Sequence, residues 1–480
     1  MIEKAGNSYH HILKYTSIFG SVQGLNIVAG LVRNKIIAIL LGPSGMGLIS
    51  LLNTWQGFVC QVTNLGISFG AVPRLSELYD EGNDAKLLHR IMVIRTWSVL
   101  TAIIGFVFCI IASPFISQMI DSNPNHIFYL VLIAPSVAIL AITGGETAVL
   151  KATRRLGALA KVQMVAAIAS VLVSLPFYYI LGIGGIVPVM IVMAFITMVV
   201  TIFYSYRQYP FRISLSRQVL TDGRSMIQLG VAFVVAAIIG SLAELLIRLF
   251  LNYHNQMGEV GLYNAAYTLT ISYAALVLAS LETDYFPRLS ASAHDLQTAQ
   301  MIVNRQMEVL FLLLAPMLTA LMVFLPWLVP LLYTEQFLSI VPMAQIMVIA
   351  MYFKALSVPV CFMPLAFQES RSYLLLEISY WLYFLMFFFI CYELWGLRGV
   401  GIAWVIAHVV EWLVAWAWVH HHYHYQLSLP MIRHIVIQLI IAMTTWLVTM
   451  YLSDSSYWIS GCLLTMMSGG FSCWILSCKR

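Results

Sequence analysis

Long apolar stretches recur along the whole 480-residue chain, and polar residues gather between them. About 14 of these stretches reach the length of roughly 20 residues that an α-helix needs to cross a bilayer. The pattern predicts an all-α, polytopic membrane protein with about 14 transmembrane helices. The predicted spans lie at 15–41, 46–73, 91–113, 127–150, 160–181, 184–206, 226–251, 260–287, 306–331, 339–368, 373–394, 399–419, 434–452 and 457–477.

Positive charge is distributed unevenly among the connections that join these spans. Most of the 25 Lys and Arg residues fall in alternate connections, and Arg398 is the clear exception. Basic loops of membrane proteins remain in the cytoplasm. The charge pattern therefore predicts that both termini of this multi-pass chain are cytoplasmic.

Composition excludes a soluble domain and offers little for catalysis. Charged residues make up only 9% of the chain, with a mean hydropathy of +0.88, whereas soluble proteins carry about 25% charged residues. The predicted connections are short, so we expect no extramembrane catalytic domain and no enzyme. The seven cysteines form no CxxC pair, and the histidine-rich run at 420–424 follows tryptophans at a predicted membrane exit, which favours interfacial anchoring. No cofactor or metal is expected.

Short sequence motifs of the first half of the chain recur in the second half at a constant offset. Pro-Arg-Leu-Ser occurs at 73–76 and at 287–290, and Gly47-Leu48 recurs as Gly261-Leu262. Self-similarity of this kind is typical of transporters built from two related bundles, and an even number of spans per half predicts a parallel repeat. The predicted domains are an N-lobe at 1–206, a cytoplasmic linker at 207–225, a C-lobe at 226–420 and two accessory spans at 421–480.

The first two spans of each half carry polar residues three or four positions apart, which places them on one helical face. Lipid cannot satisfy such a face. The stripes therefore predict a hydrated cavity between the lobes. The asparagines expected to line it and bind substrate are Asn26, Asn53, Asn64 and Asn264.

Arg33 and Arg248 stand at matching depths in the first span of each half. An arginine inside a membrane costs about 3 kcal/mol on insertion scales, and its planar guanidinium suits phosphate. The pair is predicted to hold a diphosphate group. The alternative for Arg248 is neutralisation by Glu244 one turn earlier, and for Arg33 it is packing against amide or carbonyl groups.

Other charged residues within the spans are secondary candidates. Lys354 and Lys35 are predicted as further substrate contacts, although Lys354 could instead pair with a carboxylate. Glu411 follows His408 by one turn, so a proton relay is an alternative there. The residues predicted to act in gating or coupling are Glu244, Glu282, Asp284, Arg288, Arg74 and Glu411.

Three segments resemble the Wzx-type polysaccharide flippases of the multidrug/oligosaccharidyl-lipid/polysaccharide (MOP) superfamily. They are Leu41–Gly47 (LGPSGMG), Gly258–Tyr263 (GEVGLY) and Tyr285–Ser290 (YFPRLS). The resemblance extends to about residue 420 and includes a basic position near 33–35. Because that position can correspond to Lys35 as well as to Arg33, the cation that faces the cavity stays open.

The resemblance implies two six-helix lobes around a cationic cavity and transport by alternating access. The implied substrate is an undecaprenyl-diphosphate-linked oligosaccharide of the O-antigen or common-antigen type. The implied location is the bacterial inner membrane, among lipids and polysaccharide polymerase or assembly proteins. Many members of the family stop after twelve spans, whereas fourteen are predicted here.

Two other functions are weighed against the flippase. A multidrug/cation antiporter of the same superfamily needs a deep, unpaired carboxylate and has little use for arginines. A membrane polysaccharide polymerase or ligase needs long outward loops with catalytic basic residues, and the predicted outward connections are short. The sequence therefore favours the flippase.

Overall fold

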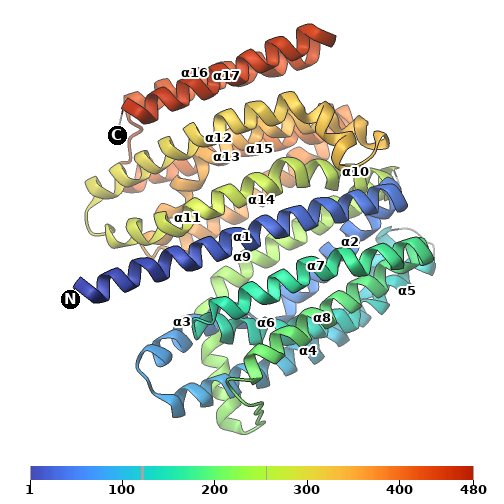
Figure 1. Ribbon diagram of the computed structural model, residues 1–480, viewed down its shortest axis with the longest axis vertical. Coiled ribbons are helices and arrows are strands. Elements are labelled where there is room, and N and C mark those ends of the chain that lie inside the picture. The colour runs from blue at the N-terminus through green and yellow to red at the C-terminus, as the bar shows by residue number, and fades with distance from the viewer. Residues whose placement is uncertain (1, 121–123, 256, 479–480) are drawn as a thin grey trace. The chain divides into compact units, whose positions relative to one another are not determined.

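The computed structural model describes the backbone of residues 2–120, 124–255 and 257–478. Within these ranges, side chains are described except at 2–20, 68–70, 124–126, 224–233, 255, 273, 276–277 and 279–284. The described chain is almost entirely helical and contains no β-strand (Figure 1). The predicted all-α, polytopic membrane fold is confirmed.

The helices follow one another with short connections (Figure 1). In order they are α1 (Ile2–Leu40), α2 (Gly42–Thr63), α3 (Ile67–Asp80), α4 (Asp84–Ile120), α5 (Pro124–Leu132), α6 (Ala134–Ala152), α7 (Leu156–Leu181), η1 (Gly182–Gly185), α8 (Ile186–Tyr206), α9 (Arg217–Asn255), α10 (Met257–Tyr267), η2 (Thr268–Ser272), α11 (Tyr273–Ala291), α12 (Leu296–Leu332), η3 (Glu335–Ile340), α13 (Val341–Ala366), α14 (Ser370–Trp395), α15 (Leu397–Tyr423), α16 (Leu429–Tyr451) and α17 (Asp454–Cys478).

Eleven segments of the described chain are long and apolar enough to cross a membrane, and one of them, Leu156–Tyr206, contains both α7 and α8. Two predicted spans, 46–73 and 260–287, are not among these segments, and neither is one regular helix. The first breaks between α2 and α3, where Leu65 and Gly66 have φ of 51° and 72°. Glycine tolerates this left-handed conformation at no steric cost. The second contains the π-helical turn η2 between α10 and α11.

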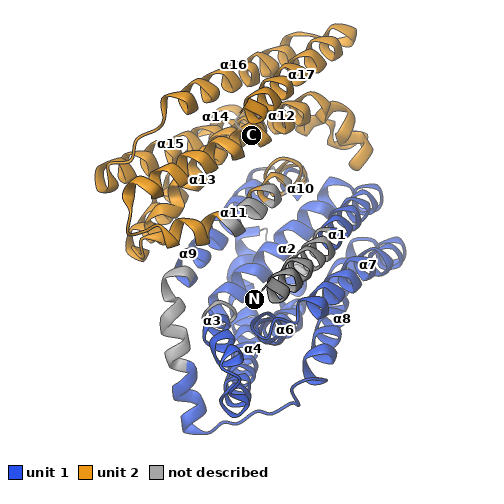
Figure 2. Ribbon diagram, turned by 60° about the vertical axis from the view of Figure 1, so that its left-hand side comes forward, with its two compact units in different colours: residues 1–260 blue, residues 261–480 orange. Residues whose placement is uncertain are grey.

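The chain forms two compact units, unit 1 (Met1–Val260) and unit 2 (Gly261–Arg480), shown in different colours in Figure 2. The division falls one helix later than the predicted boundary between 206 and 226. The reason is that α9 packs against α2, α3 and α4. The compact units therefore differ from the predicted lobes, and the internal repeat stays a prediction.

A hydrophobic cluster in unit 1 joins the short helix α3 to α4 and α6. A helix of 14 residues is marginal by itself in water, so α3 depends on this packing. Each fully buried Leu or Ile contributes roughly 1.5–3 kcal/mol. The buried members are Ile67, Ala71, Leu75, Leu87, Ile91, Ile94, Val149 and Ala152, together with Tyr209 from the connection after α8.

Unit 2 is organised around α13, which packs against α12, α14 and α15 and is the most buried of the candidate spans. The hairpin of α16 and α17 packs on α12. A hydrogen bond joins the hairpin to α12: the Tyr457 hydroxyl of α17 donates to the Val323 carbonyl of α12 at 2.7 Å. Gly461 permits the close approach, because a methyl group there would meet the Val323 side chain.

Candidate functional site

Two neighbouring cavities lie inside unit 1. The larger, of about 220 Å³, is enclosed by α1, α2, α6, α7 and α8, and its polar wall consists of Arg33, Asn53, Gln56, Ser170, Tyr178 and Thr197. The second, of about 190 Å³, shares Asn53 and Gln56 and extends along α2 to Cys60 and Asn64. The predicted polar face of α2 thus lines both cavities, with Asn53 at their common wall.

Gln56 is held in a fixed orientation within this wall. Its Nε2 donates to the Ser136 hydroxyl of α6 at 2.5 Å, and that hydroxyl donates to the Ile133 carbonyl at 2.6 Å. Satisfied polar networks of this kind rigidify a buried site. The amide-bearing face of α2 is therefore positioned by α6 before any ligand arrives.

Arg33 on α1 lines the larger cavity, and its side chain is exposed there. Tyr178 of α7, on the same wall, is close enough to interact with it electrostatically. Among the side chains that the structure describes, none forms a hydrogen bond or ion pair with the Arg33 guanidinium. An uncompensated guanidinium beside amides and hydroxyls can bind an anionic, polar ligand.

The other cations and amides predicted for α1 and α10 lie elsewhere. Lys35 and Asn26 are half-buried on α1 and line neither described cavity of unit 1, and Asn264 is half-buried on α10 in unit 2. The structure therefore places Arg33, rather than Lys35, at the cavity wall.

Arg248 is buried, with 4% of its surface exposed, and it serves packing. Its Nε donates to the Ser50 hydroxyl of α2 at 2.9 Å, and Nη1 donates to the Glu244 carbonyl at 3.0 Å. The Glu244 carboxylate lies 3.5 Å from Nη1. This is the neutralised arrangement that the sequence left open, and it fastens α9 to α2. Arg248 lines neither of the two cavities described in unit 1.

Unit 2 contains a compact charged cluster in place of an open cavity. Lys354 of α13 donates to Glu411 of α15 at 2.9 Å, and the His408 Nδ1 lies 2.7 Å from the other oxygen of that carboxylate. The Lys354 ammonium also lies 5.2 Å from the ring centre of Tyr380 on α14. The pairing of Lys354 with a carboxylate is thus the arrangement that the structure shows.

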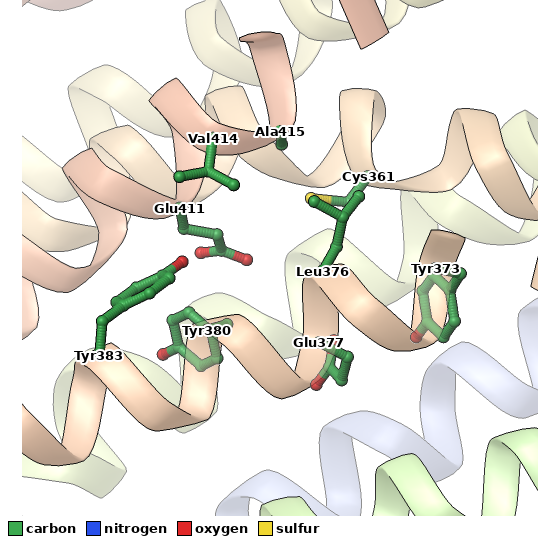
Figure 3. Close-up of a pocket in the computed structure, with 9 residues that line it drawn as sticks. All are labelled: Cys361, Tyr373, Leu376, Glu377, Tyr380, Tyr383, Glu411, Val414 and Ala415. Atoms are coloured by element: carbon green, nitrogen blue, oxygen red, sulfur yellow. The ribbon is translucent and has the colours of Figure 1, made fainter. Parts of the chain in front are cut away.

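The space beside this cluster is small. A cavity of about 20 Å³, lined in part by Glu411, Glu377 and Cys361, has room for about one water molecule. Figure 3 shows the Glu411 carboxylate directed into it, between the Tyr383 hydroxyl and Cys361. The cluster can exchange a proton with a water, but it cannot hold a phosphate or a sugar in this conformation.

Only some of the predicted gating residues have side chains that the structure describes. Arg74 forms an exposed ion pair with Glu77 at 3.1 Å on α3, worth at most about 1 kcal/mol, and Arg288 is exposed on α11. The side chains of Glu282 and Asp284 lie outside those described. The expected inner gate therefore stays a prediction.

The chain matches the family model described as "Polysaccharide biosynthesis protein" (Polysacc_synt_3) over residues 36–342, about two thirds of its length. The chain belongs to this family. No curated protein sequence matches it. The match confirms, at the level of the family, the resemblance to the polysaccharide flippases.

Solved structures of MOP superfamily transporters share the fold of this polysaccharide biosynthesis family member. A multidrug resistance MATE family transporter in an inward-facing conformation is similar with a TM-score of 0.69 and 15% identity, over 83% of this chain and 94% of its own. The lipid II flippase MurJ in an inward closed conformation gives 0.70 and 12%, over 95% and 98%. A MOP superfamily transporter from Pyrococcus furiosus gives 0.60 and 16%, over 85% and 93%. At these identities the likeness shows the fold alone.

One buried ion pair of this family member was not predicted, although Arg95 lies within the predicted span 91–113. Arg95 lies inside α4, with 3% of its surface exposed, and its Nε and Nη2 donate to the Glu146 carboxylate of α6 at 2.8 and 3.2 Å. Its Nη1 and Nη2 also donate to the Pro210 and Tyr209 carbonyls at 2.7 and 3.0 Å. The available signal was Glu146, because a carboxylate within a span requires a partner.

Proposed function

We propose that this protein flips an undecaprenyl-diphosphate-linked oligosaccharide, of the O-antigen or common-antigen type, across the bacterial inner membrane by alternating access. The observation that carries the proposal is the unit 1 cavity, in which Arg33 faces amides and hydroxyls without a described counterion. Family membership and the MOP fold support a transporter of lipid-linked sugars.

Arg33 supplies the phosphate contact in this proposal. Its guanidinium offers parallel N–H donors that match two oxygens of a phosphate, and such charge-assisted bonds are roughly twice as strong as neutral ones. Since Arg248 is occupied by Ser50 and Glu244, a second phosphate contact comes from neutral donors such as Tyr178, or from another conformation of the protein.

The amide wall supplies the sugar contacts. Asn53 and Asn64 each carry both donors and acceptors, which is what ring hydroxyls and acetamido groups require. Taken together, the two cavities reach the lower part of the range of about 300–1,000 Å³ that is usual for ligand sites. The prenyl chain remains in lipid, so the protein binds only the head group.

A multidrug or cation antiporter is less well supported. Such a carrier needs a deep carboxylate available to a cation, whereas Glu146 and Glu411 are each held in an ion pair and Glu377 accepts from the Trp381 indole at 3.2 Å. Lobes of six helices in parallel repeat, both termini in the cytoplasm and contact with polymerase or assembly proteins belong to the same proposal.

The test is translocation of a fluorescent lipid-linked oligosaccharide by the purified protein in liposomes, with a cationic dye as the rival substrate. Arg33→Ala removes the charged contact and is expected to lower translocation by about tenfold to hundredfold. Arg33→Lys keeps the charge without the bidentate geometry and should retain part of the activity. Translocation of the dye alone, or full activity of Arg33→Ala, would refute the assignment.

A further inference from the structure

The connection between α8 and α9 presents an unusual surface. Residues 207–216 contain no helix, and residues 210–216 have no regular secondary structure. Phe211, Ile213 and Leu215 follow one another at every second position and are 51%, 49% and 71% exposed, whereas Ser214 between them is half-buried. Three large apolar side chains therefore project together from a segment that lies outside every candidate span.

The opposite side of this segment is fastened to unit 1. The Ser214 N–H donates to the Thr96 hydroxyl at 3.2 Å, and the carbonyls of Tyr209 and Pro210 accept from Arg95. Further along, the Trp97 indole donates to the Val219 carbonyl at 3.3 Å. Because these bonds fix the backbone, the apolar side is held facing outward.

The charge around this apolar side is positive. Arg207, Arg212 and Arg217 are exposed on the same connection. The sequence contains no acidic residue between Glu146 and Asp222, and Asp222 is bound by His89 at 3.0 Å. The segment also leaves directly from the end of a membrane span, α8, at Tyr206, whose ring packs 5.3 Å from that of Phe211.

We propose that residues 207–217 form an interfacial anchor, which inserts Phe211, Ile213 and Leu215 among acyl chains while its arginines bind anionic phospholipid head groups. Apolar and aromatic side chains flanked by basic residues are the combination that partitions to the membrane interface. A lipid surface is favoured over a protein because the segment begins where a span ends, so the bilayer surface is its immediate neighbour. The anchor depends on membrane insertion and is independent of the proposed substrate.

The first test measures depth. Cys473 and Cys478, which are exposed, are replaced by Ser, and an environment-sensitive fluorophore is attached to Ile213→Cys or to Ser216→Cys on the opposite side. The full chain is placed in nanodiscs of phosphatidylcholine with phosphatidylglycerol, containing spin-labelled lipid. Several-fold stronger quenching at 213 than at 216 is expected. Equal quenching at the two positions, or a label at 213 that stays in water, overturns the proposal. The exposed apolar side chains would then be a binding surface for a cytoplasmic protein.

The second test measures lipid selectivity. The double variant Arg212→Ala/Arg217→Ala should bind phosphatidylglycerol at least about fivefold more weakly, because each basic residue near an anionic surface is worth roughly that factor. The matched control, Arg305→Ala/Arg371→Ala, removes the same charge from exposed positions in unit 2. An equal loss in the control shows unspecific electrostatics and overturns the proposal. Neither measurement involves a lipid-linked sugar, so a failed anchor and a failed flippase assignment are distinguishable.

Discussion

Units 1 and 2 each place a basic residue within the membrane, but its surroundings differ. In unit 1, Arg33 faces a cavity of about 220 Å³ and has no counterion among the described side chains. In unit 2, the Glu411 carboxylate is contacted by both Lys354 and His408. The adjoining cavity has a volume of only about 20 Å³. A charge inside a membrane therefore does not by itself mark a binding site. Free volume and a missing counterion distinguish the site that is proposed around Arg33.

The same distinction separates Arg33 from Arg248 within unit 1. Their positions in the sequence predict equivalent roles for Arg33 and Arg248. In the structure, however, the Arg248 guanidinium donates hydrogen bonds to Ser50 and Glu244. The two arginines should accordingly respond to mutation in different ways, one through transport and the other through stability.

The largest effect is expected in unit 2. Lys354→Ala leaves the mostly buried Glu411 carboxylate with His408 as its one described partner, and the loss of one partner of such a pair costs up to about 3–5 kcal/mol of folding stability. Thermal unfolding in detergent measures this loss. The double variant Lys354→Met/Glu411→Leu should recover most of it. Normal stability together with lost transport in Lys354→Ala would instead make Lys354 the substrate contact that the sequence predicts.

Arg248→Ala should cost less, about 1–3 kcal/mol, because it removes the bonds to the Ser50 hydroxyl and the Glu244 carbonyl, while the Glu244 side chain is already partly exposed. Per folded molecule, translocation should remain close to that of the wild type. The decisive measurement is translocation normalised to folded protein, compared with Arg33→Ala. If Arg248→Ala abolishes transport without destabilising the fold, the contrast between the two arginines fails.

A smaller effect is expected for the amide wall. Asn53→Ala removes a neutral hydrogen bond to substrate, worth about 1 kcal/mol or roughly fivefold in apparent affinity. The fold should be unaffected, because Asn53 is exposed to the cavity. Asn264→Ala, at an amide outside both cavities, is the matched control. A larger loss of affinity in Asn264→Ala than in Asn53→Ala would show that the substrate site does not lie in unit 1.

The smallest effect on stability is expected at Asp295, an exposed carboxylate of unit 2. It is the comparison for the mostly buried carboxylate of Glu411. Asp295 caps α12 by accepting from Thr298 and Gln297, and these bonds lower its pKa below the ordinary value of 3.8. Its stabilisation is therefore complete above about pH 4 and is lost as the pH falls through the lowered pKa. Asp295→Asn should slightly lower the melting temperature at neutral pH and remove this acid dependence. Any pH dependence above 4 that survives in the variant must then arise elsewhere.

Hydropathy and charge were sufficient to predict a helical, polytopic membrane protein, because the bilayer imposes one length and one polarity on each span. They did not predict the break at Leu65 and Gly66, since a hydropathy window averages over a three-residue turn. They also did not predict that α9 joins unit 1, because that depends on a bond between Arg248 and Ser50, 198 residues apart.

The candidate site was predictable in part. The stripe of polar residues on α2 placed Asn53 and Asn64 on one helical face, and both line a cavity. The choice between Arg33 and Lys35 required the positions of α7 and α8, which close the cavity around Arg33. Glu146 indicated that a buried ion pair is present, but its partner, Arg95 on another helix, could be identified only from the structure.

The interruption between α2 and α3 has a consequence for how the second cavity can be studied. A helix that stops at Thr63 leaves carbonyl oxygens in its last turn without intrahelical donors, and this turn lies between Cys60 and Asn64 on the cavity wall. Main-chain acceptors survive every alanine substitution, so alanine variants of Asn53 and Asn64 test only the side-chain part of the proposed sugar contacts. A β-branched residue at Gly66, whose φ is 72°, would strain this turn and so test what the break itself contributes to the cavity.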